Sequence, residues 1–80
     1  TEERRRDLIR FVNNRLEEAR VSVRNIRRDL IKDLRDFEQE KMIGEDDRKQ
    51  GEEDVQKLTD KYIEEIGEVG KAKEEEIMEI

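Results

Sequence analysis

Arginine is the side chain with the clearest chemical potential in this sequence. Residues 1–28 contain nine basic residues, all of them arginine, against five acidic ones. The guanidinium group forks onto phosphate oxygens and stacks on bases, whereas the lysine ammonium group is a compact point charge. The densest stretch, RVSVRNIRRD at residues 20–29, has no acidic residue before Asp29. This pattern predicts a surface that binds nucleic acid.

The other side chains support little catalytic chemistry. The chain has no cysteine and no histidine, which excludes thiol and imidazole catalysis, disulfides and the usual zinc ligand sets. Carboxylates run together at residues 64–65 and 74–76, but runs of this kind usually face solvent, and no pocket-forming residues surround them. We therefore predict that the protein is not an enzyme and uses no metal, no cofactor and no small-molecule substrate.

The sequence gives no sign of export or membrane insertion. No apolar run approaches the roughly 20 residues that span a bilayer, and no signal-peptide pattern is present. We expect a cytoplasmic protein without membrane contact. The sequence begins at Thr1 and not at methionine, so an upstream portion could precede it.

Two helical segments must position the arginines. Apolar residues recur at steps of three and four in both halves, which is typical of one face of a helix. In the first half they are Leu8, Val12, Leu16, Ala19, Val23, Ile26, Leu30, Leu34 and Phe37; in the second they are Val55, Leu58, Tyr62, Ile66, Val69, Ile77 and Ile80. Lys73 continues the second series between Val69 and Ile77, with its aliphatic stem on the same face. We predict an all-α hairpin of two long antiparallel helices, at residues 2–42 and 47–79, with a turn at residues 43–46.

The ends of these helices carry recognisable signals. Thr1 is a good N-cap for the first helix, and Gly44 is expected to adopt the left-handed conformation that ends it. Acidic residues at positions 45–47 suit the start of the second helix. Gly51, Gly67 and Gly70 fall inside that helix, where they either loosen it or, at Gly70, permit close approach of a neighbouring helix.

Such a hairpin leaves much of its apolar surface uncovered. Even with about sixteen side chains buried, the apolar area is small for 80 ordered residues. We therefore expect a further helix to pack against the hairpin, from another segment of the protein or from a second copy.

The arginines are expected to form a ridge. At 100° per residue most of them, together with Arg35, share one strip of the first helix, roughly 110° from the apolar stripe. The RNA-binding residues predicted from this strip are Arg20, Arg24, Arg27 and Arg28, with Arg6 and Arg10. Contacts to the backbone and the shape of the RNA are expected to dominate over recognition of individual bases. The acidic half of the chain, residues 44–80, should be repelled by phosphate and so fix the orientation of binding.

The sequence also resembles a known family. TEERRRDL at residues 1–8, VRNIRRD at residues 23–29, QKLTD at residues 56–60 and KEEEIMEI at residues 73–80 are similar, in order and spacing, to the carboxy-terminal part of domain I of bacterial ribosome recycling factor. The resemblance implies that these are helices two and three of a three-helix bundle, and that the first helix and a second, β-rich domain are absent.

The resemblance also implies function and site residues. It implies a factor that binds large-subunit ribosomal RNA and, with elongation factor G, splits ribosomes after termination. Its RNA-contacting arginines match Arg24 and Arg27, with Arg20, Asn25 and Arg28 as neighbours. Arg5 also matches a family arginine, although the helical wheel places it on the apolar side. The sequence departs from the family at Ser22 and at the glycines 51, 67 and 70.

Two other interpretations fit the same pattern. One is an antiparallel coiled coil that self-associates through its exposed apolar seam, with the arginines engaged in surface ion pairs. Sedimentation across concentration, with and without RNA, separates it from an RNA-binding protein. The other is an RNA-binding arm like the helical hairpin of some transfer-RNA synthetases, which would prefer free transfer RNA to large ribosomal subunits.

Overall fold

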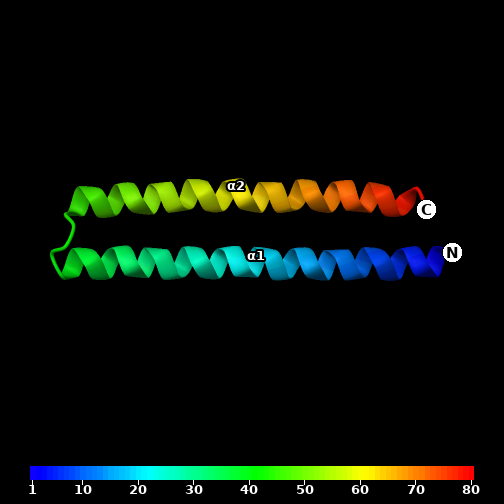
Figure 1. The fold of residues 1–80 in the computed structure, drawn as a ribbon, viewed down its shortest axis with the longest axis horizontal. Coiled ribbons are helices and arrows are strands. Elements are labelled where there is room, and N and C mark those ends of the chain that lie inside the picture. The colour runs from blue at the N-terminus through cyan, green and yellow to red at the C-terminus, as the bar shows by residue number, and fades with distance from the viewer.

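Two long helices and one turn make up the structure (Figure 1). The computed structural model describes residues 1–80, in which α1 (Glu2–Gln39) precedes α2 (Glu45–Met78) and no strand occurs. The helices lie side by side and antiparallel, so both chain termini are at one end and the turn is at the other. The principal extents are 60 × 15 × 9 Å. The predicted all-α hairpin is confirmed. Neither helix has a stretch long and apolar enough to cross a membrane.

Both helices begin where the chain satisfies or complements their free N–H groups. The Thr1 hydroxyl accepts a hydrogen bond from the backbone N–H of Arg4 at 3.3 Å, as predicted for an N-cap. The first turn of α2 has no side-chain cap but contains Glu45, Asp46 and Asp47. Their negative charge is favourable beside the positive end of the helix dipole.

The turn contains the main departure from the predicted helix bounds. α1 ends at Gln39, three residues before the predicted end, and Lys41 adopts the left-handed conformation with φ of 62°. The N–H of Met42 donates to the carbonyl of Phe37 at 2.8 Å, and the N–H of Lys41 donates to the carbonyl of Glu38 at 2.9 Å. These two bonds form a Schellman motif, which ends the helix without a glycine.

Gly44 therefore has a different role from the one predicted. Its backbone is extended, with φ −87° and ψ 173°, and it is the N-cap of α2, which starts at Glu45 and not at residue 47. Because the Schellman motif has already closed α1, no second left-handed residue is needed. The prediction of a left-handed Gly44 was wrong, and the connection is residues 40–44.

The contact between the helices is thin. Only three residues are buried, namely Thr59, Gly70 and Ile77, and no side chain is fully enclosed. The Thr59 hydroxyl donates to the carbonyl of Val55 at 2.8 Å, so burial leaves it satisfied. The roughly sixteen buried side chains assumed from the sequence are therefore too many for the hairpin alone.

The rotation of α1 explains this shortfall. Six of the nine stripe residues of α1 are half-buried, but in the carboxy-terminal half Arg27 and Ile31 take the half-buried positions, so the line of contact there shifts from the apolar stripe towards the arginine strip. Ile26 and Leu30, which belong to the stripe, remain 59% and 45% exposed. Small residues of α2 lie on the same line of contact and let the helices approach closely, which leaves larger apolar side chains at the side.

Gly70 is the clearest of these small residues. A Cβ atom at this position would lie 2.5 Å from Leu16 Cδ1, closer than van der Waals contact allows. At Gly67 nothing lies within 4 Å of the equivalent position. The interpretation of Gly70 as a point of close helix approach is confirmed.

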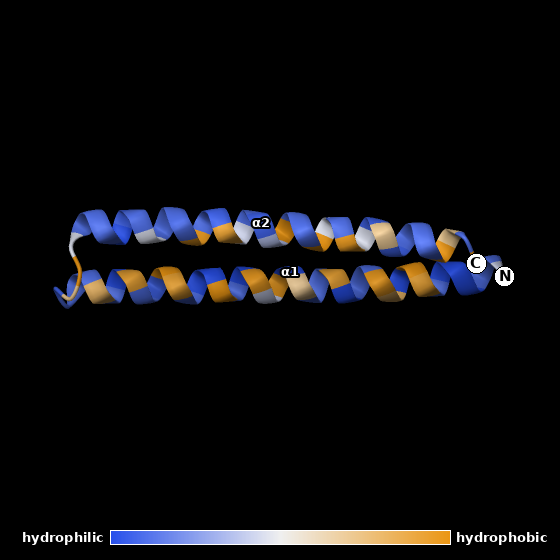
Figure 2. Cartoon of the chain, turned by 45° about the horizontal axis from the view of Figure 1, so that its top comes forward, coloured by the Kyte–Doolittle hydropathy of each residue, from blue (hydrophilic) through white to orange (hydrophobic).

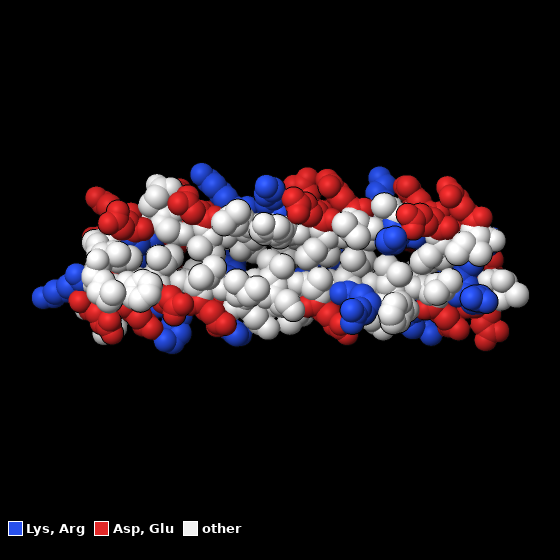
Figure 3. Space-filling model, in the orientation of Figure 1, with Lys and Arg blue, Asp and Glu red and all other residues white.

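The displaced apolar side chains line an open groove between the helices. Two apolar recesses share Val23 and Tyr62 and so continue one another along the hairpin. Figure 2 shows hydrophobic residues along both helices, and Figure 3 shows a face whose middle is mostly uncharged while charged side chains border it. We call this surface the apolar groove; it comprises Leu16, Ala19, Val23, Ile26, Leu30, Val55, Leu58, Tyr62, Ile66 and Val69.

Candidate nucleic-acid interface

One unbroken helix carries all the predicted RNA-binding arginines. α1 is continuous from Glu2 to Gln39. At 1.5 Å per residue, the group at residues 20–28 spans about 12 Å of the helix axis, and Arg10 lies about 15 Å before it. We call the six residues the arginine ridge: Arg6, Arg10, Arg20, Arg24, Arg27 and Arg28. The structure therefore places four of them within about two turns and the other two separately.

Most ridge arginines have a carboxylate nearby. Glu17 lies 3.3 Å from Arg20 and 3.7 Å from Arg24, and Asp29 lies 3.5 Å from Arg28. These acids flank residues 20–28, which explains how a stretch without acidic residues still forms ion pairs. Exposed pairs of this kind contribute little free energy, so a phosphate group can replace the carboxylate.

The two ridge arginines nearer the amino end differ from each other. Arg10 pairs with Asp7 at 3.8 Å, while Arg6 has no ion pair and no side-chain hydrogen bond. Arg5, on the apolar side in the helical wheel, is half-buried and lies 3.6 Å from Glu2.

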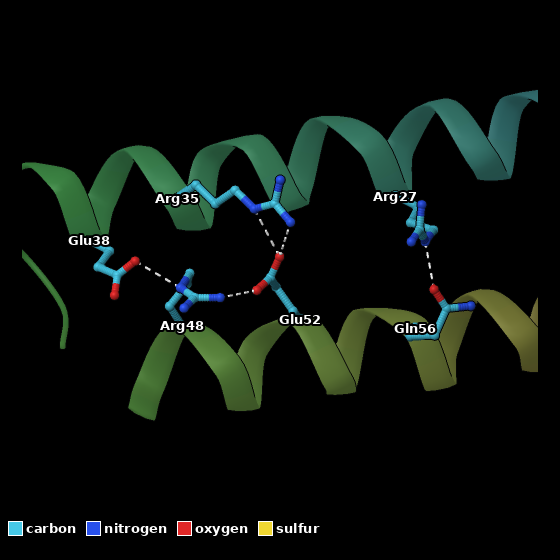
Figure 4. Close-up of polar contacts among 6 residues, drawn as sticks. All are labelled: Arg27, Arg35, Glu38, Arg48, Glu52 and Gln56. Atoms are coloured by element: carbon cyan, nitrogen blue, oxygen red, sulfur yellow. Dashed lines mark hydrogen bonds and ion pairs between the residues drawn. The ribbon is translucent and has the colours of Figure 1, made fainter. Parts of the chain in front are cut away.

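Arg27 differs from every other ridge arginine because its partner is neutral and lies on α2. Its Nε–H donates to Gln56 Oε1 at 2.7 Å, and Gln56 Nε2 in turn donates to Asp60 Oδ1 at 2.8 Å. Figure 4 shows the Arg27 side chain reaching across from α1 to Gln56. No carboxylate lies within ion-pair distance of Arg27.

Two shallow recesses meet at Arg27. One, of about 510 Å³, is lined by Arg24 and Arg27 from α1 and by α2 residues that include Gln56 and Asp60. The other, of about 450 Å³, is lined on α1 by four cationic side chains and one acid, namely Arg27, Arg28, Lys32, Arg35 and Asp36, together with Ile31. The second recess is the more electropositive, so it suits an anion better.

Lys32 is a residue of this surface that the sequence prediction missed. Its Nζ lies 2.7 Å from Asp36 Oδ2, and the hydrogen bond and negative charge of Asp36 raise the pKa of Lys32. The signal that could have found it is its spacing, because Lys32 follows Arg24 and Arg28 at intervals of four.

Near the turn, four charged residues join the two helices (Figure 4). Arg35 Nη2 lies 2.9 Å from Glu52 Oε1, and Arg48 Nε lies 2.8 Å from Glu38 Oε1. Arg48 also donates to Glu52. The hydrogen bond from Arg48, and then that from Arg35, lower the pKa of Glu52, while the bond to Glu52 raises the pKa of Arg48. Arg35 therefore links α1 to α2 through Glu52, although its position on the helical wheel matches that of the ridge.

The chain is similar to known proteins over its whole length. The family model described as ribosome recycling factor matches residues 1–78. Curated ribosome-recycling factors are 56% identical in Halalkalibacterium halodurans, 54% in Syntrophomonas wolfei and 50% in Roseiflexus castenholzii, each over all 80 residues. The chain spans 43% of the length of each of these relatives. This chain belongs to the ribosome recycling factor family.

Proposed function

We propose that this chain is the helical, RNA-binding part of a translation factor. In this proposal the arginine ridge binds large-subunit ribosomal RNA, and the factor splits post-termination ribosomes together with elongation factor G, in the cytoplasm and without catalysing a reaction. The observation that carries the proposal is the family match over residues 1–78. The unbroken α1, which aligns the ridge, supports RNA as the partner.

We also propose that the hairpin supplies helices two and three of a three-helix bundle. The apolar groove is the place where the first helix would pack, because half of its side chains are exposed in the hairpin alone, namely Ile26, Leu30, Leu58, Tyr62 and Val69. The chain spans 43% of its relatives' length, which leaves room for that helix and for a second domain. In helical bundles, a third helix usually packs into an apolar groove of this kind between two antiparallel helices.

The mode of RNA binding follows from the charges. The ridge offers guanidinium groups at intervals that match a run of phosphates more readily than base edges, so positioning contacts should dominate. The second half of the chain carries 14 acidic and 6 basic residues, which repel phosphate. Binding is therefore expected to be one-sided, with the α1 strip towards RNA and the outer surface of α2 away from it.

Removal of single ridge arginines tests the proposal. In the complete natural protein, Arg24→Ala and Arg27→Ala should each weaken binding to isolated large ribosomal subunits, by roughly tenfold. Each should also reduce the slope of log affinity against log salt by roughly 0.7 to 1, because one phosphate contact is lost. Equilibrium binding measured across a salt series reports both quantities.

Arg15→Ala is the matched control. Arg15 lies on the same helix and makes a similar exposed pair, with Glu18 at 3.4 Å, but it is outside the ridge. Its removal should leave affinity and slope unchanged. If all three variants behave alike, or if the Arg24 and Arg27 variants bind as the parent does, the ridge is not the RNA interface.

A further inference from the structure

We infer that Gln56 is a positioning residue that holds the guanidinium group of Arg27 ready for phosphate. The inference rests on the proposed function, because it assigns a second residue to the same RNA-binding surface. Gln56 belongs to α2 and is 29 positions from Arg27 in the sequence, yet its Oε1 lies 2.7 Å from Arg27 Nε.

The orientation of the Gln56 amide group follows from its second partner. A carboxylate only accepts hydrogen bonds, so the amide –NH₂ group of Gln56 must be the end that faces Asp60. The distance from Gln56 Nε2 to Asp60 Oδ1 is 2.8 Å. The amide oxygen therefore faces Arg27, and it is the correct partner for the Nε–H donor.

The bond to Gln56 leaves the phosphate-binding edge of Arg27 free. Only Nε of Arg27 is engaged, and neither of its two terminal nitrogens has a protein partner. A guanidinium group fixed through Nε has its plane and direction set, while its outer edge is open to a bidentate contact. Because the rotamers of a long side chain are restricted before binding, less entropy is lost when RNA arrives.

The neighbouring arginines lack this arrangement. Arg20 and Arg24 each approach Glu17 through one terminal nitrogen, and Arg28 Nε lies 3.5 Å from Asp29 Oδ1, so each of them has a partner that is negatively charged and competes with phosphate. Arg27 is also half-buried at the line of contact between the helices, which further limits its motion. Gln56 therefore makes Arg27 the best prepared phosphate ligand of the ridge.

The chain contains a matched control for Gln56. Gln50 makes the same bond to an acid one turn later, from Nε2 to Asp54 Oδ1 at 3.0 Å, but no arginine contacts it. Substitution by methionine keeps side-chain length and helix propensity and removes the acceptor. Gln56→Met and Gln50→Met thus differ in one respect, the loss of the contact with Arg27.

The first measurement is the ¹⁵N NMR signal of the Arg27 Nε–H group in the complete protein, assigned by its absence in Arg27→Lys. We expect this signal to be ordered and slow to exchange in the parent and in Gln50→Met, and mobile in Gln56→Met. A purely structural effect of Gln56 on α2 would not change the Arg27 side chain alone. An equally ordered signal in Gln56→Met would overturn the inference whatever the binding data show.

The second measurement is affinity for isolated large ribosomal subunits. Gln56→Met should weaken binding roughly two- to tenfold, the range expected when one long side chain loses its preorganisation. The salt slope should stay unchanged because no charge is removed. In an Arg27→Lys background Gln56→Met should cause no further loss, since lysine has no Nε–H fork to orient.

The outcomes separate this inference from the proposed function. Loss of order in the NMR signal without any loss of affinity would make Gln56 structural only and would overturn its role in binding. Undiminished binding by Arg27→Ala would overturn the assignment of Arg27 to the RNA interface, and the role of Gln56 with it. An equal loss of affinity from Gln50→Met would point to α2 stability and would also overturn the inference.

Discussion

Glu17 is the acidic residue that pairs with two arginines of the ridge. Its two carboxylate oxygens lie 3.3 Å from Arg20 Nη1 and 3.7 Å from Arg24 Nη1, so one side chain partly neutralises two cations. All three side chains are at least partly exposed to solvent, and ion pairs of this kind contribute at most about 1 kcal/mol each to the free energy of folding. Glu17 thus competes with phosphate for the same guanidinium groups.

Removal of this competition should strengthen RNA binding. We expect Glu17→Gln to bind large ribosomal subunits roughly two- to fivefold more tightly at low salt. In this variant Arg20 and Arg24 can contact phosphate without first losing an ion pair with Glu17. Glu18→Gln is the control, because Glu18 pairs with Arg15, outside the ridge, and should change nothing. Equal affinity in the two variants would show that Glu17 does not compete with RNA.

The sequence predicted the positions of the ridge better than the environment of each arginine. Helical spacing places Arg20, Arg24, Arg27 and Arg28 on one strip once α1 is unbroken. The contact between Arg27 and Gln56 depends on how the two helices are aligned with each other, and this alignment cannot be predicted from the sequence pattern of either helix alone. The carboxylate partners of the other arginines depend on rotamers, which sequence does not specify.

At the scale of the helices, Gly70 sets the distance between α1 and α2 near the open end of the hairpin. It is buried, and an added Cβ would lie 2.5 Å from Leu16 Cδ1. Leu16 is itself only half-buried, so it can shift, but doing so opens the contact between the helices. We expect the cost of opening this contact to exceed the gain in helix propensity that alanine normally brings.

Gly70→Ala should therefore destabilise the complete protein, by about 1 to 3 kcal/mol, the usual cost of overpacking. Gly67→Ala is a matched control three residues away, with nothing within 4 Å of the added Cβ. It should stabilise by up to about 1 kcal/mol through helix propensity. Urea unfolding measures both free energies. Stabilisation by both substitutions would show that Gly70 is not a contact point.

Helix type was predictable, whereas helix ends and rotation were less so. Apolar steps of three and four extend through both segments, and no proline interrupts them. The end of α1 depends on the left-handed Lys41, a residue type that gives no such signal. The rotation of α1 depends on where small residues such as Thr59 and Gly70 fall on α2, which becomes visible only when the two helices are paired.

At the scale of the whole molecule, the line of contact between the helices separates two different surfaces. Most of the arginine ridge lies on one side of this line and the apolar groove on the other, while Arg20 and Arg27 are half-buried at the line itself and Arg27 also lines the apolar recess. A groove that includes exposed Ile26, Leu30, Leu58, Tyr62 and Val69 is unusual for the free surface of a monomer. The same rotation that leaves the groove uncovered brings Arg27 into reach of α2.

Leu30 and Val21 test whether the groove is covered in the complete protein. Both are 45% exposed in the hairpin, but only Leu30 belongs to the groove. If another helix packs there, Leu30→Gln should destabilise the complete protein by about 2 kcal/mol or more, the loss typical of a buried leucine. Val21→Gln should change the free energy of unfolding by no more than about 0.5 kcal/mol, as at an ordinary surface position.

Urea unfolding of the complete protein gives both values, and sedimentation of the isolated 80 residues gives an independent comparison. The isolated hairpin should associate as its concentration rises, because a second copy can cover the groove, and Leu30→Gln should reduce that association. The Val21 variant should associate as the parent does. Equal and small effects of the two substitutions on unfolding would mean that the groove stays open to solvent and that no third helix occupies it.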